Sequence, residues 1–148
     1  MPSITLPAPT ATGPLVSVFV AVRKDEADQL KAAGLPVPDP VVGRFLIDTG
    51  ASHTNMDDEI AAKLKIKPVD FVSVHTPSTN GVPVQVPVYA VDLIMPGRPG
   101  KPMHIVRSAF VSCSHFKSQG IDGLIGRDVL SEIVLIYDGP GQTCTLSY

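Results

Sequence analysis

The residues best suited to chemistry lie in one stretch in which an apolar segment ends on a carboxylate and small residues follow. It reads Phe45-Leu46-Ile47-Asp48-Thr49-Gly50-Ala51-Ser52. A buried carboxylate is costly unless it is hydrogen-bonded or protonated. The backbone N–H of Gly50 is placed to supply such a hydrogen bond to Asp48. The pattern indicates a carboxylate held for acid–base chemistry, although an ordinary Asx or Ser/Thr turn capped by Asp48 would use the same residue types.

A second pattern lies further along the chain, where two apolar residues precede Gly126-Arg127-Asp128 and two more follow. We interpret it as a strand, a glycine and a short helix that carries a base and an acid. The alternative is a glycine turn into a capped helix whose charges, Arg127 and Asp128, are solvated. A phosphate-binding loop is disfavoured, because the glycine spacing and the Lys-Ser/Thr ending of such loops are missing.

Other chemistries find less support. The four histidines, His53, His75, His104 and His115, are widely spaced. Cys113 and His115 form a short cluster that lacks a second half at zinc-ligand spacing, so we expect no metal and no cofactor. Neither cysteine has the neighbours that would activate a Cys–His nucleophile. His53 follows the Asp48 stretch closely, and we interpret it as a local hydrogen-bonding residue or one at the edge of a substrate site.

Length and composition limit the class of protein. The chain has 148 residues, 44% of them hydrophobic, and a formal net charge of -2. This predicts one folded domain without the basic excess of a nucleic-acid-binding protein. No apolar run is long enough to span a membrane, and the N-terminus lacks the pattern of a secretion signal. We therefore expect a cytoplasmic protein in which Cys113 and Cys144 are buried thiols.

The elements that must position the Asp48 stretch are mostly strands. Short runs rich in valine and isoleucine are cut by 15 prolines and 12 glycines, which is typical of an all-β fold with one or two short helices. Residues 1–14 are expected to form an extended N-terminal arm, and residues 15–148 a single domain. Strands are expected over 15–22, 41–47, 69–75, 82–95, 103–111, 133–137 and 143–148, and another begins the 120–130 segment. A short helix or turn is expected over 25–34 and a short helix over 55–64.

Two of these strands suggest a hairpin around the turn residues 76–81. In the second strand, four valines from Val82 to Val88 alternate onto one face. Pro83 and Pro87 cannot donate hydrogen bonds to a neighbouring strand. The first half of this strand is therefore predicted to be an edge or a projecting arm.

Together, the two motifs and the hairpin resemble the retropepsins, the single-lobe aspartic proteases of retroviruses, retroelements and some bacteria. The resemblance rests on Leu46 to Ser52, on Thr76 to Gly81 and on Leu124 to Leu130, and it covers roughly residues 15 to 148. It implies a closed, barrel-like β fold in which two identical chains each supply one catalytic aspartate. It also implies a flap hairpin that closes over a peptide substrate.

The resemblance also implies roles for single residues. Asp48 would be the catalytic carboxylate, and Thr49, Gly50, Ala51 and Ser52 would support its loop. The flap tip would carry Thr79, Asn80 and Gly81. Gly126, Arg127 and Asp128 would begin a supporting helix, with Arg127 in a structural ion pair whose acid the sequence does not name. Cys144 to Tyr148 would help to form a sheet between subunits.

The chemistry implied by this family needs two carboxylates that share a proton. The Asp-Thr-Gly pattern occurs once, since Asp57-Asp58, Asp122-Gly123 and Asp138-Gly139 do not repeat it. The sequence therefore predicts an aspartic endopeptidase that acts as a symmetric homodimer on peptide or protein substrates. A non-catalytic dimerisation or peptide-binding module on the same fold is the alternative.

Overall fold

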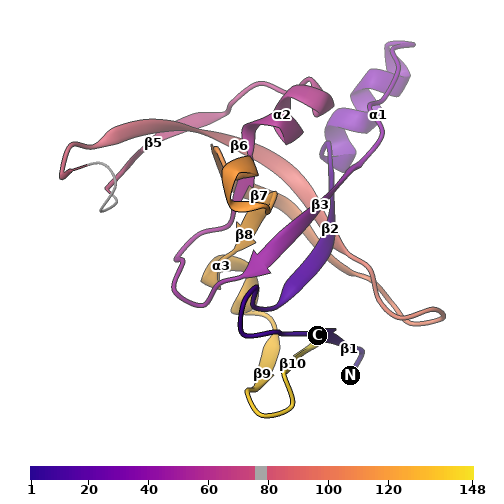
Figure 1. The fold of residues 1–148 in the computed structure, drawn as a ribbon. Coiled ribbons are helices and arrows are strands. Elements are labelled where there is room, and N and C mark those ends of the chain that lie inside the picture. The colour runs from indigo at the N-terminus through magenta and orange to yellow at the C-terminus, as the bar shows by residue number, and fades with distance from the viewer. Residues whose placement is uncertain (76–79) are drawn as a thin grey trace.

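The fold is a closed β-barrel with a smaller sheet at one end (Figure 1). The computed structural model describes residues 1–75 and 80–148. Six strands form the ring, because β2 pairs with both β3 and β6. In spatial order they are β2 (Leu15–Ala21), β3 (Val41–Ile47), β8 (Gly123–Ile125), β4 (Asn55–Asp57), β7 (His104–Ser114) and β6 (Val84–Met95). The expected closed, mostly β fold is confirmed.

Alternation of side chains fills the barrel. In β2, Val16, Val18 and Val20 are buried, whereas Ser17 and Phe19 face outward. Such a two-residue period is what a strand with one buried face requires. Helix α2 (Asp58–Leu64) adds to this core through its buried residues Ile60, Ala61 and Leu64.

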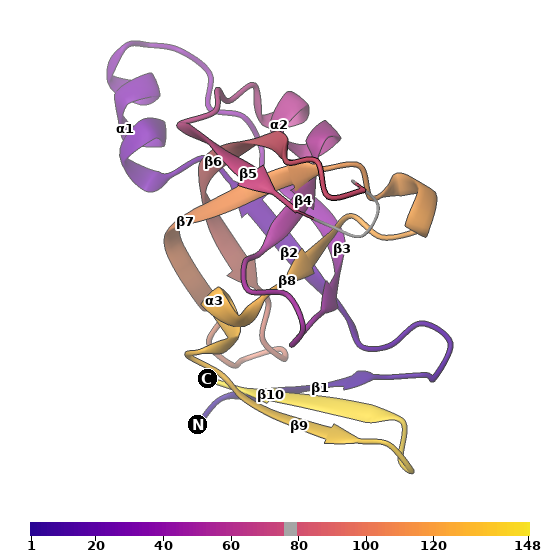
Figure 2. The ribbon, with the colours of Figure 1, turned by 90° about the vertical axis from the view of Figure 1, so that its left-hand side faces the viewer.

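The smaller sheet joins segments from the two ends of the sequence (Figure 2). Its strands are β1 (Ser3–Pro7), β10 (Thr143–Ser147) and β9 (Val134–Asp138), in that spatial order. The segment expected as an extended arm thus contains a strand, and its residues Leu6 and Ala8 are buried. β10 pairs with β1 on one edge and with β9 on the other. A strand from another molecule could therefore extend this sheet only at β1 or β9.

The hairpin of β5 (Asp70–Val74) and β6 projects from the barrel (Figure 1). β6 pairs with β7 only from Val88 onward, and its segment Val84–Pro87 pairs with β5 alone. The prediction of a projecting arm is confirmed, and we call residues 70–74 and 84–87 the arm. Of the predicted tip residues, Asn80 and Gly81 are described, and Thr79 lies outside the described residues.

The helices differ from expectation in one place. Residues 55–57 were expected to begin a helix but form β4, because they pair in parallel with β7 and antiparallel with β8. α2 begins only at Asp58. α1 (Lys24–Ala32) has no buried residue, α3 covers Arg127–Leu130, and a short 3₁₀ helix, η2, covers Lys117–Gln119. None of the helices in the described ranges is long and apolar enough to cross a membrane.

The two cysteines are free and buried, as predicted. Burial is the main cause that raises the pKa of the Cys113 thiol to about 12, and the nearby carboxylates of Asp58 and Asp57 contribute. Burial also raises the pKa of Cys144. Both thiols are therefore held in the protonated form, which is a poor nucleophile.

We expect neither thiol to react readily with Ellman's reagent at pH 8 in the folded protein. The reaction should be at least about a hundredfold slower than in the chain unfolded by guanidinium, because both thiols are buried away from the reagent and burial raises the pKa of each. Stopped-flow absorbance on folded and unfolded protein measures both rates. A folded-state rate equal to that of the unfolded chain would contradict the assigned burial.

Asp57 ties α2 to the segment that follows β7. Its Oδ1 accepts a hydrogen bond from the Glu59 N–H at 3.1 Å, and its Oδ2 accepts from Phe116 at 2.8 Å and Lys117 at 3.1 Å. Only 1% of the residue is exposed. Burial by itself would raise the pKa of this carboxyl, but the donated hydrogen bonds outweigh it and hold the pKa below its ordinary value. The ionised form is thus more favourable in the folded than in the unfolded chain.

This difference makes stability depend on pH. The stabilisation should be complete above the unfolded-state pKa of about 4 and should be lost as the pH falls through the lower folded-state pKa. We expect Asp57→Asn to lower the free energy of unfolding by about 1–3 kcal/mol at pH 7 and to lose less stability on acidification. Urea unfolding from pH 7 to pH 2.5 tests this. Parallel pH profiles for the two proteins would refute the role of Asp57.

Candidate active site

Asp48 stands where β3 leaves the barrel wall. The parallel strand β8 lies alongside, and the Asp48 N–H donates to the Ile125 carbonyl oxygen at 3.0 Å. The loop then turns back, so that the Gly50 N–H donates to Asp48 Oδ1 at 2.9 Å and the Ala51 N–H to the Asp48 carbonyl at 3.2 Å. Asp48 is half-buried, and Thr49 and Gly50 are exposed. The carboxylate is therefore oriented by its own loop and remains accessible.

The first residue of α3 holds this loop at two points. The Arg127 N–H donates to the Ala51 carbonyl oxygen at 2.9 Å, and the guanidinium Nη1 donates to the Thr49 carbonyl oxygen at 2.8 Å. Across the described part of the chain, no acidic side chain lies within ion-pair distance of Arg127. The expected ion pair is therefore not formed within the described part of the chain, because the guanidinium binds the Thr49 backbone carbonyl instead.

A second set of hydrogen bonds joins the two motifs through Thr54, which is 0% exposed. Its N–H and hydroxyl donate to the two carboxylate oxygens of Asp128 at 2.9 and 2.8 Å. Its hydroxyl oxygen accepts from the Gly126 N–H at 3.0 Å. Asp128 Oδ1 also accepts from the N–H of the next residue, Val129, at 2.9 Å. Asp128 is thus a structural acceptor although the residue is exposed, and Thr54 is a site residue that the sequence analysis missed.

Close backbone contact explains the glycines of the second motif. A Cβ atom at Gly126 would lie 2.5 Å from the carbonyl carbon of His53. One at Gly123 would collide with the Asn55 carbonyl oxygen and with the ring of Phe45. Both positions require glycine because neighbouring residues of the same chain occupy the space that a side chain would need.

Asp48 borders one face of the barrel wall. Strand pairing aligns five residues in one row across the barrel wall, namely Leu46, Leu124, Asn55, Ser112 and Val88. Successive residues of a strand point to opposite faces. Because Asp48 follows Leu46 by two positions, its side chain points to the same face as this row.

The same face continues onto the arm. Val86 and Val84 lie two and four positions before Val88 in β6, and they pair with Val72 and Val74 of β5. All four valines therefore share the face of the row. We call the row and these valines together the Asp48 face. It offers an extended, mostly apolar surface beside the carboxylate.

The remaining predicted residues lie at the edges of this arrangement. Ser52 is exposed, and its hydroxyl is 2.9 Å from Nδ1 of His53. Asn80 and Gly81 adopt left-handed backbone conformations, with φ of 48° and 77°, at the far end of the arm. The structure thus brings Asp48, Thr49, Gly50 and Ala51 together with the second motif, while the described tip residues belong to the separate arm.

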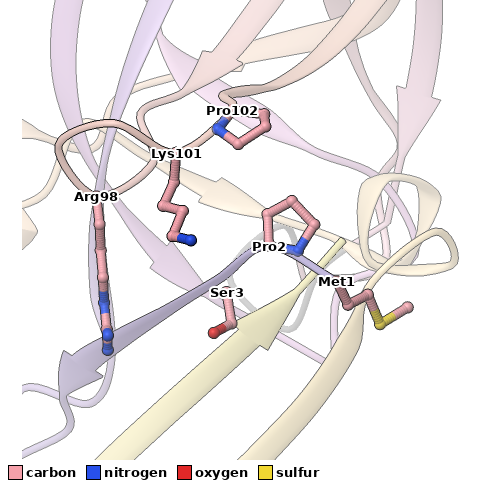
Figure 3. A pocket seen from close by; sticks show the side chains of 6 residues that line it. All are labelled: Met1, Pro2, Ser3, Arg98, Lys101 and Pro102. Carbon is pink, nitrogen blue, oxygen red and sulfur yellow. The ribbon is translucent and has the colours of Figure 1, made fainter.

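Two hollows lie near the smaller sheet. One, of about 220 Å³, is lined by Ile47 and Thr49 and by residues of the smaller sheet, Leu135, Tyr137 and Cys144, with Pro14. The other, of about 390 Å³, lies between the start of β1 and the β6–β7 loop (Figure 3). Its lining residues, Met1, Pro2, Ser3, Arg98, Lys101 and Pro102, include none of the predicted site residues. Only the smaller hollow adjoins the Asp48 loop.

The contacts of Thr54 lead to a stability prediction. Thr54→Val keeps the shape of the side chain but leaves the buried Gly126 N–H without an acceptor and removes one donor to Asp128. We expect the free energy of unfolding to fall by about 2–4 kcal/mol. Thr5→Val is a matched control, since the Thr5 hydroxyl is exposed and contacts only the hydroxyl of Thr145 and, at 3.5 Å, Arg98. It should cost less than about 1 kcal/mol.

Urea unfolding of both variants at one protein concentration measures these values. Equal losses in Thr54→Val and Thr5→Val would show that the Thr54 hydroxyl does not join the two motifs.

Comparison with known proteins agrees with this arrangement. The model of a family described as aspartyl protease matches residues 29–129. None of the curated proteins matches the sequence. Among solved structures, the fold is similar to that of a retropepsin-like aspartic protease from Rickettsia conorii, with a TM-score of 0.63 and 16% sequence identity. The similarity covers 99% of this chain and 90% of that one. The chain therefore belongs to the aspartyl protease family and has the retropepsin-like fold.

Proposed function

We propose that the protein is an aspartic endopeptidase whose active unit is a symmetric homodimer with one Asp48 from each chain. The observation that carries the proposal is the position of Asp48, the carboxylate of the one Asp-Thr-Gly loop, which the second motif holds at two carbonyl oxygens. A loop held so firmly around an accessible carboxylate suits a group that must keep its orientation during a reaction. Membership of the aspartyl protease family supports the same chemistry.

The chemistry requires two such carboxylates close together. Two carboxylates about 3 Å apart cannot both ionise readily, so they share a proton. The ionised member accepts a proton from a water molecule bound between them, and the protonated member donates a hydrogen bond to the carbonyl oxygen of the scissile peptide bond. The Gly50 N–H, which bonds Asp48 Oδ1, fixes the direction in which each carboxylate faces. A second copy of the chain supplies the second carboxylate at a two-fold axis.

The surface proposed for the second copy includes the smaller sheet and the exposed Thr49. The β9 residues Val134, Ile136 and Tyr137 are 51%, 59% and 55% exposed. Val134 and Ile136 lie on one face of β9 and Tyr137 on the other, and exposed apolar side chains are typical of an interface. Tyr137 also lines the hollow that reaches Thr49, so a contact on the face of Tyr137 would bring the two Asp48 loops together.

The arm is proposed as the flap that covers a substrate. The valines of the arm belong to the Asp48 face, and an extended peptide could lie along this face. The backbone of Asn80 and Gly81, with positive φ, supplies the turn at the end of the arm. A peptide held between the arm and the barrel wall would present its backbone to Asp48.

Mixing subunits tests the shared site. Asp48→Asn removes one acid–base group and should abolish cleavage of a peptide library. When wild-type and Asp48→Asn chains are unfolded together in equal amounts and refolded, random pairing leaves about a quarter of the dimers with two aspartates. We expect about a quarter of the activity of an equal total amount of wild-type protein.

A control refolds wild-type chains with the Asp28→Asn variant, whose substitution lies on the exposed helix α1 outside the smaller sheet, and should retain full activity. Half of the activity in the Asp48→Asn mixture would mean that each chain carries a complete site. Cleavage by Asp48→Asn alone would refute the mechanism.

A further inference from the structure

One polar pair interrupts the row on the Asp48 face. Asn55 and Ser112 lie opposite each other on β4 and β7, between Leu124 on one side and Val88 on the other. Asn55 is half-buried and Ser112 is 8% exposed. The Ser112 hydroxyl donates a hydrogen bond to Asn55 Oδ1, and Asn55 Nδ2 donates to the His53 carbonyl oxygen at 3.0 Å.

These hydrogen bonds do not use all the capacity of the pair. A side-chain amide has two N–H donors, and a hydroxyl oxygen can accept as well as donate. One N–H of Asn55 and the lone pairs of Ser112 Oγ therefore remain for a partner. The pair is not needed to join the two strands, because backbone pairing from Asn55↔Ser112 to Asp57↔Ser114 already does so.

We propose that Asn55 and Ser112 form a polar subsite that selects a peptide side chain ending in a carboxamide, that of asparagine or glutamine. A carboxamide oxygen accepts from the free N–H of Asn55, and its amino group donates to Ser112 Oγ. Leu124 and Val88 contact the aliphatic part of the same side chain. The inference rests on the proposed function in that the occupant of the Asp48 face is a peptide.

The subsite would distinguish a carboxamide from an apolar side chain because an apolar side chain leaves the polar groups of Asn55 and Ser112 unpaired. An apolar side chain of the same size would take water from Asn55 and Ser112 without replacing its hydrogen bonds. Sites that hydrogen-bond a substrate group reject analogues that lack it more strongly than apolar pockets reject a missing methylene. Because the pair is not fully enclosed, we expect a preference for glutamine over leucine of about tenfold or more in kcat/KM.

The test replaces both members of the pair by apolar groups of similar shape, in the double variant Asn55→Leu/Ser112→Ala. Its matched control is Lys24→Met/Asp28→Ala on α1, which lies outside the Asp48 face and the arm. There Lys24 Nζ donates to Asp28 Oδ2 at 2.7 Å, and both residues are exposed. Peptides that carry glutamine or leucine at one position at a time around the scissile bond are the substrates. Analogues in which that bond is a reduced, non-cleavable amide measure binding.

For wild type and the control variant, we expect glutamine to be preferred at one position in both cleavage and binding. Asn55→Leu/Ser112→Ala should lose that preference or favour leucine there, with cleavage of the leucine peptide retained. A preference that is absent in wild type, or that survives in this variant, overturns the inference. Preferential binding without cleavage would refute the proposed function and keep the subsite. Neither binding nor cleavage of any peptide would refute both.

Discussion

The arrangement depends on one close contact, in which the backbone of residues 53–55 lies against that of residues 123–126. The contact leaves no room for a side chain at positions 123 and 126, and both residues are glycine. At this separation the hydroxyl of Thr54 reaches both the Gly126 N–H and Asp128. The same contact sets β4 beside β8, which closes the ring of strands. It also sets α3 against the Asp48 loop, so barrel closure and the orientation of the carboxylate have one physical cause.

The contact divides the Asp48 face into a rigid and a more loosely held part. Around Asp48, a hydrogen bond to the Ile125 carbonyl oxygen of β8 and the hydrogen bonds donated by Arg127 of α3 hold the chain on both sides. The arm is held only by the pairing of β5 with residues 84–87 of β6, and its valines are exposed or partly exposed. Local stability follows the number of buried contacts and protected hydrogen bonds. A substrate-binding cleft requires a fixed reacting group, which the first part carries, and a segment that can move over the substrate, which the second part supplies.

The sequence analysis succeeded where the signal is local and failed where it is not. A run rich in valine located β2, and an apolar segment followed by Asp-Thr-Gly located the Asp48 loop. β4 was mistaken for the start of a helix because Asn55 or Asp57 can cap a helix and acidic residues follow, and Asp57 is in fact the N-cap of α2. Its strand pairing depends on residues more than 50 positions away, which no local pattern contains. The same holds for Thr54 and for the carbonyl that Arg127 binds, since both interactions span more than 70 positions.

The smaller sheet has a consequence for the order in which the chain folds. β1 pairs with β10 across nearly the whole sequence, from Ser3 to Ser147, whereas every strand of the ring lies between them. Bringing distant segments together costs more entropy than closing shorter loops, and an already folded barrel shortens that distance. The ring can therefore form first and the sheet of β1, β10 and β9 last. The apolar residues of β9 would then come into place only on chains whose interior is complete, so a half-folded chain would not offer its neighbours a finished surface for association.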